Sequence, residues 1–358
     1  MATSSNLTFR VIFSILITSD VIGNTLGVLT VMRSKTLRTT PTYLLLTNLC
    51  CANILVGVFF IPTAYVINDA ITYPNSSIAA GFLCKFVTQS TLSWTGLQAA
   101  VFTLVVIAFE RYFVVVHPRS EYGRFTRRKL NIVIAGSWLY AIVFVLPDFV
   151  TQTYDVTQSK CTNEWTITFK TFYATLWLLS CGVLPLIIMG VLFSKIHRKI
   201  SQSWKTETAI SQRALLTARR RLSHSALVVM VIYAVSWLPN LVMYLIDNIS
   251  STFSEQDVLY LTSHTLLILY STVIPFVYLG LDEQFQASFK ALFSRGNEVM
   301  PSAELEGRDD GVAKGVTMAT SFVLTARADA EAPSSYDIPI WGADMDEKSD
   351  EKSDAENS

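Results

Sequence analysis

Residues 105–118, VVIAFERYFVVVHP, place a glutamate and an arginine side by side at the end of a long apolar run. Almost every residue before Glu110 and Arg111 is Leu, Val, Ile, Ala or Phe. A charge is costly in an apolar medium unless it is paired and hydrogen-bonded. The explanation for this pair therefore depends on the solvent that surrounds the stretch.

The composition indicates that this solvent is a lipid bilayer. Of the 358 residues, 51% are hydrophobic and 16% are charged, whereas about 25% are charged in ordinary soluble domains. A helix needs about 20 apolar residues to cross a bilayer. Seven such runs occur, at residues 9–32, 42–67, 85–115, 130–150, 171–196, 223–247 and 257–279. We therefore expect an all-α membrane protein, with a short extracellular N-terminus at 1–8 and a seven-transmembrane helix bundle at 9–279.

A short helix is predicted directly after the seventh span. In LDEQFQASFKALF, which begins at residue 281, Phe285, Phe289 and Leu292 fall on one face of a helix. An amphipathic helix of this kind lies along a membrane surface. We therefore expect residues 281–294 to form an amphipathic membrane-surface helix.

The C-terminal tail carries the opposite charge to the rest of the chain. Residues 1–299 hold 23 Lys/Arg and 14 Asp/Glu, whereas residues 300–358 hold 5 and 14. A segment so acidic and poor in apolar residues cannot form a core. We expect residues 295–358 to be a disordered cytoplasmic tail that serves solubility, or a phosphorylation platform, because Ser349 and Ser353 precede acidic residues.

Basic residues predict the orientation of the spans. They gather in the first, third and fifth loops, at Arg33, Lys35, Arg38, Arg119, Arg124, Arg127, Arg128, Lys129, Lys195, Arg198, Lys199, Lys205, Arg213 and Arg219 to Arg221. The alternate loops hold few Lys or Arg, so the positive-inside rule places the N-terminus outside and the C-terminus in the cytoplasm. Residues 9–32 exceed the length of a signal-peptide core, and we expect a retained first span of a multi-pass plasma-membrane protein.

Two cysteines fall in predicted outer segments, where the environment is oxidising. Cys84 and Cys161 can therefore form a disulfide between the start of span 3 and the second outer loop; two unrelated free thiols are the alternative. Asn6 and Asn75 each begin an N-x-S/T sequon on the outer side and are predicted glycosylation sites.

The charge pair itself has two explanations. The 27 residues from Cys84 to Arg111 span about 40 Å of helix, which places Arg111 at the cytoplasmic boundary. There Glu110 is its natural partner. The pair is either a static contact or one that opens when another group offers Arg111 a better contact.

Prolines and aromatic residues in the later spans favour the second explanation. Trp237 lies two residues before Pro239 in the sequence SWLP, and IPFVY contains Pro275 and Tyr278. A proline inside a helix removes a backbone donor and kinks the helix. Spans 6 and 7 are therefore predicted to bend.

Together these features resemble the rhodopsin-like (class A) family of G-protein-coupled receptors, over about residues 9–294. Glu110, Arg111 and Tyr112 match the acid-Arg-Tyr triplet of the family. Its toggle tryptophan and hinge proline correspond to Trp237 and Pro239, and its span 7 motif to Pro275 and Tyr278. Asn24, Trp138 and Pro185 match the markers of spans 1, 4 and 5.

The resemblance implies signalling without chemistry. A ligand from outside favours one packing of spans 5, 6 and 7, and the inner face opens to a heterotrimeric G protein. Arg111 then leaves Glu110, so the charge pair is predicted to act as a switch. A phosphorylated tail would add arrestin as a partner.

The chain departs from the family at several positions. Asn53 replaces the span 2 aspartate, and Ile274 replaces the asparagine before the span 7 proline. Arg219 stands where an acid often bridges to Arg111. Cys84 lies two residues further from Arg111 than is usual, which predicts a rearranged start of span 3 or a rearranged disulfide.

The resemblance also bears on the ligand. CKFV and VFTLVVIAFERY are similar to the galanin- and somatostatin-type neuropeptide receptors, and KCTNEWTI, which contains Trp165, resembles the second outer loop of peptide receptors. We expect a peptide ligand; a lipid or other small molecule, or a constitutively active orphan receptor, are alternatives. Residues that match lining positions are Tyr65, Ser93, Leu97, Gln98, Trp165, Trp237, Asn240, Leu241, Tyr244, His264 and Leu267. Each of them has bundle packing as its alternative role.

Other functional classes find little support. No enzyme motif or nucleic-acid signature occurs, and only Asp20 among the acids lies deep in a span, so we expect neither catalysis nor a cofactor or metal site. A transporter, the runner-up, would show paired broken helices in related halves, and the prolines show no such symmetry.

Overall fold

The computed structural model describes residues 2–60, 72–74, 76–120, 125–157, 160–163, 165–206, 210–250 and 258–294. Within this part of the chain, seven helical segments are long and apolar enough to cross a membrane. The predicted seven-helix bundle is confirmed, and the chain is a multi-pass membrane protein. Tyr65, Asn75 and the acidic tail at 295–358 lie outside the described residues.

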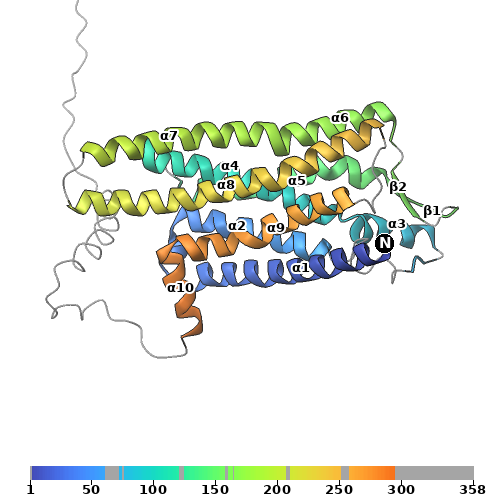
Figure 1. Cartoon of the computed structure of the whole chain (residues 1–358), viewed down its shortest axis with the longest axis horizontal. Coiled ribbons are helices and arrows are strands. Elements are labelled where there is room, and N and C mark those ends of the chain that lie inside the picture. Colours follow the sequence, from blue (N-terminus) through green and yellow to red (C-terminus); the bar gives the residue numbers. More distant parts are fainter. Residues whose placement is uncertain are drawn as a thin grey trace, which may run out of the picture. The chain divides into compact units, whose positions relative to one another are not determined.

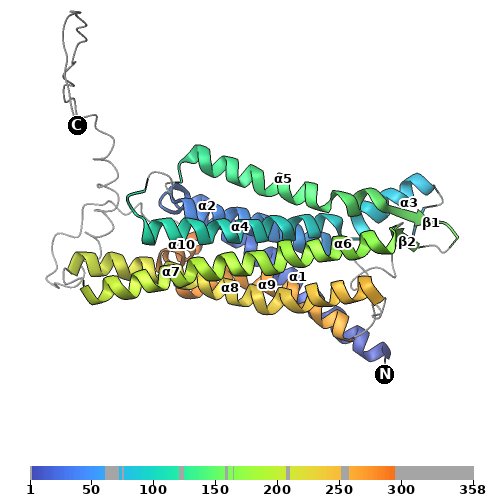
Figure 2. The ribbon, with the colours of Figure 1, turned by 90° about the horizontal axis from the view of Figure 1, so that it is seen from above.

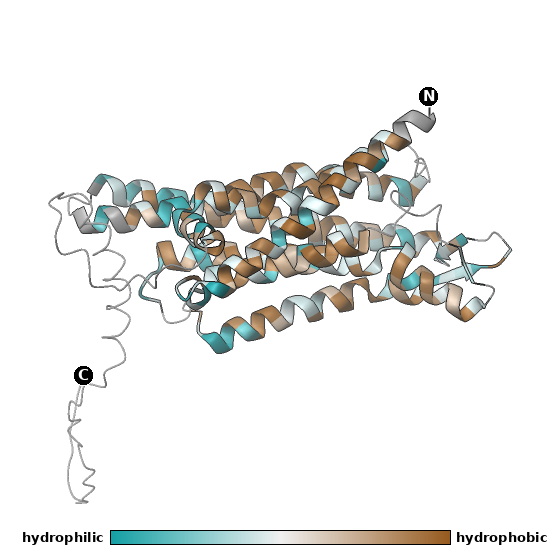
Figure 3. Ribbon diagram, turned by 90° about the horizontal axis from the view of Figure 1, so that it is seen from below, coloured by the Kyte–Doolittle hydropathy of each residue, from teal (hydrophilic) through white to brown (hydrophobic). Residues whose placement is uncertain are grey.

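The helices follow one another in antiparallel order (Figures 1 and 2). Their bounds are α1 Ala2–Arg33, α2 Pro41–Phe60, α3 Ser77–Leu83, α4 Thr91–Val116, α5 Arg127–Thr151, α6 Ile167–Leu178, α7 Leu184–Thr206, α8 Ile210–Ser250, α9 Val258–Leu281 and α10 Glu283–Phe293. Span 3 is formed by α3 and α4, and span 5 by α6 and α7. Figure 3 shows apolar residues along the middle of the bundle and polar residues toward its two ends. The first helix begins seven residues earlier than the predicted span.

Small residues allow the helices to approach closely. A Cβ built on Gly96 of α4 would lie 2.7 Å from the carbonyl oxygen of Ala52 on α2. A Cβ on Gly23 of α1 would lie 3.2 Å from the ring of Pro275 on α9. Apolar side chains gain little by leaving lipid for another helix, so contact through small residues is what holds such helices together.

Span 5 changes its helical geometry just before Pro185. A π turn, Leu179–Val183, joins α6 to α7. Proline has no N–H and its ring clashes with the carbonyl four residues earlier, which is that of Cys181. The hydroxyl of Tyr233 on α8 donates a hydrogen bond to this carbonyl. The group that the proline leaves without a helical partner thus ties span 5 to span 6.

Pro275 is compensated in the same way, from the first span. The carbonyl four residues before it belongs to Ser271 and accepts from the side-chain amide of Asn24 at 3.2 Å. The same amide donates to Asp20 Oδ1 at 2.9 Å, and Asn53 donates to Asn24 Oδ1 at 3.2 Å. All three polar side chains are fully buried, so a short polar chain joins α1, α2 and α9.

The start of span 3 differs from the prediction of one continuous helix over 85–115. A π turn, Cys84–Thr88, follows α3, and Ser90 then adopts a left-handed conformation with φ 54° and ψ 26°. A non-glycine residue in this region costs roughly 1–3 kcal/mol. The rearranged start of span 3 that the position of Cys84 predicts is therefore present, and helix α4 begins only at Thr91.

The loop between α5 and α6, predicted to be the second outer loop, contains a hairpin that the sequence did not predict. Strand β1, Gln152–Asp155, pairs antiparallel with β2, Lys160–Asn163, in the register Tyr154 to Cys161. Cys161 forms the predicted disulfide with Cys84, and their Cα atoms are 5.7 Å apart. The hairpin is thereby attached to the π turn above span 3.

The amphipathic helix is present as α10 and begins at a cap. The Asp282 side chain accepts from the backbone N–H groups of Gln284 and Phe285, at 3.0 and 3.1 Å. It also accepts from the hydroxyl of Tyr43 on α2 at 2.8 Å. Burial raises the pKa of Asp282 above its ordinary value. Phe285 is buried against the bundle, which fixes where α10 leaves it.

Candidate functional site

The charge pair of the opening stretch forms a closed cluster with a third residue. Arg111 Nε donates to Glu110 Oε2 at 2.5 Å, and Nη2 donates to Oε1 at 2.6 Å. Arg111 Nη2 also donates to the hydroxyl of Thr42, which itself donates to Glu110 Oε2 at 3.0 Å. The three side chains are buried, with 4%, 2% and 1% of Arg111, Glu110 and Thr42 exposed. The sequence reasoning missed Thr42, which comes from the first turn of α2.

A cation, Arg219 of α8, and a further acid, Asp282, lie within electrostatic reach of Arg111, but neither forms an ion pair with it in the described chain. No acidic residue of α8 pairs with Arg111 in the described chain. The ion pair that α8 does make is between Arg221 and Glu283 of α10. Glu110 and Thr42 therefore provide the contacts that hold Arg111.

The other predicted switch residues include Tyr112 and Tyr278, which lie on α4 and α9. The Tyr112 hydroxyl lies 3.0 Å from His117 Nε2, and the Lys195 ammonium lies 5.8 Å from the centre of the Tyr112 ring. Tyr278 is buried, with its ring 6.4 Å from that of Phe285. Tyr112 thus contacts Lys195 of α7, and Tyr278 packs at the junction of α9 and α10.

Deep in the bundle, Trp237 packs among tyrosines. Its ring centre lies 5.5 Å from that of Tyr233 and 6.5 Å from that of Tyr270. The side chain is fully buried, and its indole N–H has no hydrogen-bond partner in the part of the chain that the structure describes. Pro239 lies inside α8 two residues later. Because proline has no N–H, α8 lacks a backbone hydrogen bond there, and a movement of the Trp237 side chain would occur next to this weakened point.

Above Trp237, an aromatic layer connects four helices. The ring of Trp94 on α4 lies 5.6 Å from Trp177 on α6 and 6.1 Å from His264 on α9. Trp177 in turn lies 6.5 Å from Tyr244 on α8. Trp177 was missed by the sequence reasoning, although the density of aromatic residues between 165 and 177 was a signal that could have found it. Trp165 packs at the same end, 4.8 Å from the ring of Tyr173.

Several predicted lining residues make hydrogen bonds within the bundle. Ser93 donates to the carbonyl of Val56 at 3.1 Å. The thiol of Cys181 donates to Gln98 Oε1 at 2.7 Å, and Gln98 Nε2 is buried without a partner in the described chain. The unused donor of Gln98 is therefore a polar group that a ligand reaching this depth would satisfy.

Two further lining residues are paired across α8 and α9. Asn240 donates to the hydroxyl of Ser263 at 3.1 Å. The imidazole Nδ1 of His264 donates to the carbonyl of Tyr260 at 3.1 Å. His264 is thus a hydrogen-bonded residue of α9 that presents its ring to Trp94. Leu97, Leu241 and Leu267 are buried in the core between these polar groups.

Within the described ranges, no set of three or more His, Cys, Asp or Glu side chains gathers to hold a metal ion. What the geometry provides is an aromatic and polar layer at one end of the bundle, a closed charge cluster at the other, and proline-bearing helices between them.

Comparisons with known proteins agree with this arrangement. The family model described as "7 transmembrane receptor (rhodopsin family)" matches residues 23–278. The chain is 29% identical over 301 residues to neuropeptide FF receptor 1 of Rattus norvegicus, covering 76% of this chain and 67% of that receptor. It is 25% identical over 307 residues to the pyroglutamylated RF-amide peptide receptor of Mus musculus, covering 80% and 69%. It is 24% identical over 295 residues to galanin receptor type 1 of Mus musculus, covering 80% and 82%. Since the family model spans more than half of the chain, the protein belongs to the rhodopsin family of seven-transmembrane receptors.

Proposed function

We propose that the protein is a plasma-membrane receptor that binds an extracellular peptide and activates a heterotrimeric G protein. The observation that carries the proposal is the buried Thr42–Glu110–Arg111 cluster at the Lys- and Arg-rich end of the bundle. A charge held by contacts that rearrangement of the helices can break is suited to a conformational switch. The relatives named for neuropeptide FF, RF-amide peptide and galanin support a peptide as the ligand.

In this proposal the N-terminus is extracellular and the C-terminus cytoplasmic, because the positive-inside rule assigns the basic end of the bundle to the cytoplasm. The peptide approaches the end that carries the hairpin and the disulfide. There the lining comprises Ser93, Leu97, Gln98, Trp165, Trp237, Asn240, Leu241, Tyr244, His264 and Leu267, with Trp94 and Trp177 added. Signalling is by conformational change rather than catalysis. Arrestin would bind a phosphorylated tail, and Asn6 and Asn75 would carry glycans.

The proposal is tested by nucleotide exchange on a G protein, with peptide-library agonists and two variants of opposite effect. Arg111→Ala removes the side chain that the opened inner face presents, so agonist-stimulated exchange is expected to disappear. Glu110→Gln keeps the shape of the carboxylate but removes its charge, so exchange without agonist is expected to rise. Arg119→Ala, an exposed arginine of the same inner end, is the matched control.

Protein quantity and folding are checked by the amount of receptor at the cell surface. Full agonist response in a well-expressed Arg111→Ala variant would contradict the switch. Stimulation by lipids but by no peptide would favour the small-molecule alternative.

A further inference from the structure

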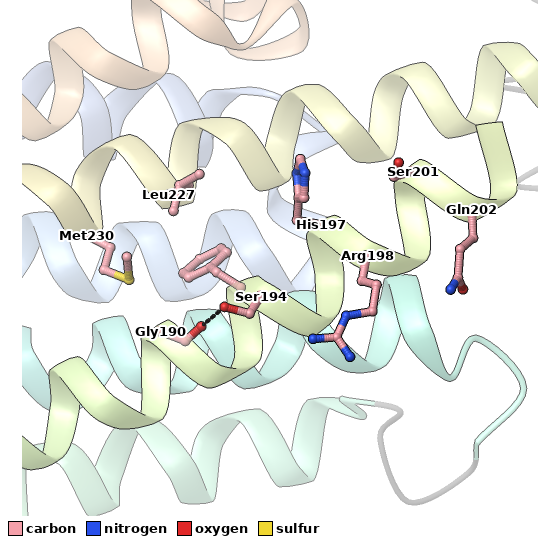
Figure 4. Close-up of a pocket in the computed structure, with 9 residues that line it drawn as sticks. Gly190, Ser194, His197, Arg198, Ser201, Gln202, Leu227 and Met230 are labelled. Carbon is pink, nitrogen blue, oxygen red and sulfur yellow. Dashed lines mark hydrogen bonds between the residues drawn. The ribbon is translucent and has the colours of Figure 1, made fainter. Parts of the chain in front are cut away.

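A groove lies at the seam between α7 and α8 (Figure 4). Its cavity volume is about 570 Å³, within the range of small-molecule sites. Phe193 of α7 and Leu227 and Met230 of α8 form its apolar part. In Figure 4, Leu227 and Met230 extend from α8 toward α7. Both helices belong to segments apolar enough to span the membrane.

The groove faces away from the core. On α7, Leu192, Ile196 and Ile200 are buried in the core, whereas four lining residues of the groove, Ser194, His197, Arg198 and Ser201, are exposed. Phe193 is buried and lies at the boundary, because it belongs both to the core and to the lining of the groove. A surface of the membrane-spanning segment that does not face the core faces lipid. The occupant with which this groove is in permanent contact is therefore a membrane lipid.

The polarity of the groove changes along its length as the polarity of a phospholipid does. The groove begins at Gly190, and Arg198 lies two turns further along α7, toward its basic end. From Gly190 to Ser201 the helix rises about 16 Å, about half of the hydrocarbon thickness of a bilayer. The groove thus has the length of one acyl chain of one leaflet, and its basic end lies toward the headgroups.

The polar group beside the apolar part of the groove already has a hydrogen-bond partner within the protein. The hydroxyl of Ser194 donates to the carbonyl of Gly190 at 2.7 Å, within its own helix (Figure 4). A Cβ built on Gly190 would meet nothing within 4 Å. The missing side chain therefore leaves open space where an acyl chain can lie against the α7 backbone.

The basic end has a cation without a partner. Arg198 makes no hydrogen bond or ion pair with any residue that the structure describes. Its neighbour Lys195 lies over the ring of Tyr112, and Arg221 of α8 is paired with Glu283. A guanidinium forms charge-assisted hydrogen bonds with phosphate oxygens, and a long arginine side chain reaches the headgroup layer from within the apolar region.

We propose that this groove binds an acidic phospholipid of the leaflet at the basic end of the bundle. Its phosphate pairs with Arg198, and one acyl chain lies between Phe193, Leu227 and Met230, over Gly190. The position of a lipid across the α7–α8 seam makes it a third component of the contact between spans 5 and 6. The inference requires the membrane position of these helices and neither a peptide ligand nor a G protein.

The test uses the full chain, purified in detergent with phosphatidylserine and phosphatidylcholine that carry a photoactivatable diazirine in one acyl chain. Crosslinked peptides are identified by mass spectrometry, and retained lipid is counted by native mass spectrometry. We expect phosphatidylserine to label the α7 and α8 peptides that contain Gly190 and Met230, in preference to phosphatidylcholine.

Two variants separate the headgroup from the chain. Arg198→Gln should lower phosphatidylserine labelling about fivefold, the equivalent of about 1 kcal/mol for one basic residue at an anionic surface. Lys199→Gln is its matched control, because Lys199 is an exposed neighbour outside the groove with the same charge. Gly190→Leu fills the open space over Gly190 in which the acyl chain is proposed to lie, so it should reduce labelling by both lipids. Gly136→Leu on α5, where a Cβ also meets nothing within 4 Å, is the control for a leucine added to the bundle.

Three outcomes would each contradict one part of the proposed lipid site. Equal loss in Arg198→Gln and Lys199→Gln would show unspecific attraction to the basic end and would overturn the headgroup site. Equal labelling by both lipids in the unmodified protein would overturn the preference for an acidic lipid. Labelling that is unaffected by Gly190→Leu would place the acyl chain elsewhere. Because Gly190→Leu leaves all charges in place, it remains decisive if Arg198→Gln is not recovered in folded form.

Discussion

Replacing Thr42 with valine should increase signalling in the absence of ligand. Valine keeps the branched shape of threonine but lacks the hydroxyl, which accepts from Arg111 Nη2 and donates to Glu110 Oε2 at 3.0 Å. Arg111 keeps its two bonds to Glu110, at 2.5 and 2.6 Å. The substitution thus weakens the closed cluster without leaving Glu110 unpaired.

The substitution removes two hydrogen bonds to charged groups, and the smaller value for a single bond gives the least effect to expect. A hydrogen bond to a charged group contributes about 1.5–3 kcal/mol, and the smaller value corresponds to a factor of roughly ten in an equilibrium constant. If these bonds exist only in the closed state, the open state gains about tenfold in population while it remains the minor form. Nucleotide exchange without ligand, divided by the amount of receptor, should rise by at least that factor.

The assay measures nucleotide exchange on a purified G protein by receptor in nanodiscs, with no peptide present. Thr47→Val is the matched control, since it makes the same substitution in the same helix. The Thr47 hydroxyl donates to the carbonyl of Tyr43 in its own helix at 2.9 Å and does not contact the charge pair. If Thr42→Val and Thr47→Val show the same basal exchange, Thr42 does not restrain the switch and the reasoning is wrong.

Three further predictions concern the fold and its ion dependence. Alkylation of the denatured, unreduced protein should leave Cys84 and Cys161 unmodified, because they form the disulfide; an adduct on either would refute the bond. Tyr233→Phe should lower the free energy of unfolding by about 1–3 kcal/mol, since a buried backbone carbonyl loses its donor, and an unchanged thermal midpoint in detergent would show that the bond contributes nothing. Agonist affinity should be the same in sodium chloride and in N-methylglucamine chloride at equal ionic strength, because neutral Asn53 stands where the family has a carboxylate. A sodium effect that Asp20→Asn abolishes would show that the cation binds at Asp20.

The seven spans could be predicted from the sequence because each is a long apolar run whose recognition needs no knowledge of its neighbours. The disulfide could be predicted because only Cys84 and Cys161 fall in outer segments. The charge pair could be recognised because Glu110 and Arg111 are two adjacent charges at the end of an apolar run. Thr42 was not, because it is 68 positions away from Glu110 in the sequence and only packing of α2 against α4 brings the two together.

The local irregularities were also beyond the sequence. Ser90 has no intrinsic preference for a positive φ, so its left-handed conformation follows from the constraints around it. The hairpin strands Gln152–Asp155 and Lys160–Asn163 are four residues each and mostly polar, which is too short for a periodic pattern. The prolines were visible, but not the donors that compensate them, since Asn24 and Tyr233 come from other helices.

The irregular start of span 3 determines how this protein should be aligned with its relatives. The resemblance to the family implies two additional residues between Cys84 and Arg111. We predict that they are accommodated before Thr91, where the π turn and Ser90 interrupt the helix. Numbering that starts at the cysteine therefore assigns every residue of α4 to a position two places away from its true equivalent. Each residue of a helix turns by about 100°, so such an alignment would rotate the helix by about 200° and exchange its pocket face for its opposite face. Numbering that starts at Arg111 and proceeds outward keeps Ser93, Leu97 and Gln98 on the face that is proposed to line the ligand pocket, and homology-based docking of ligands should be anchored at Arg111.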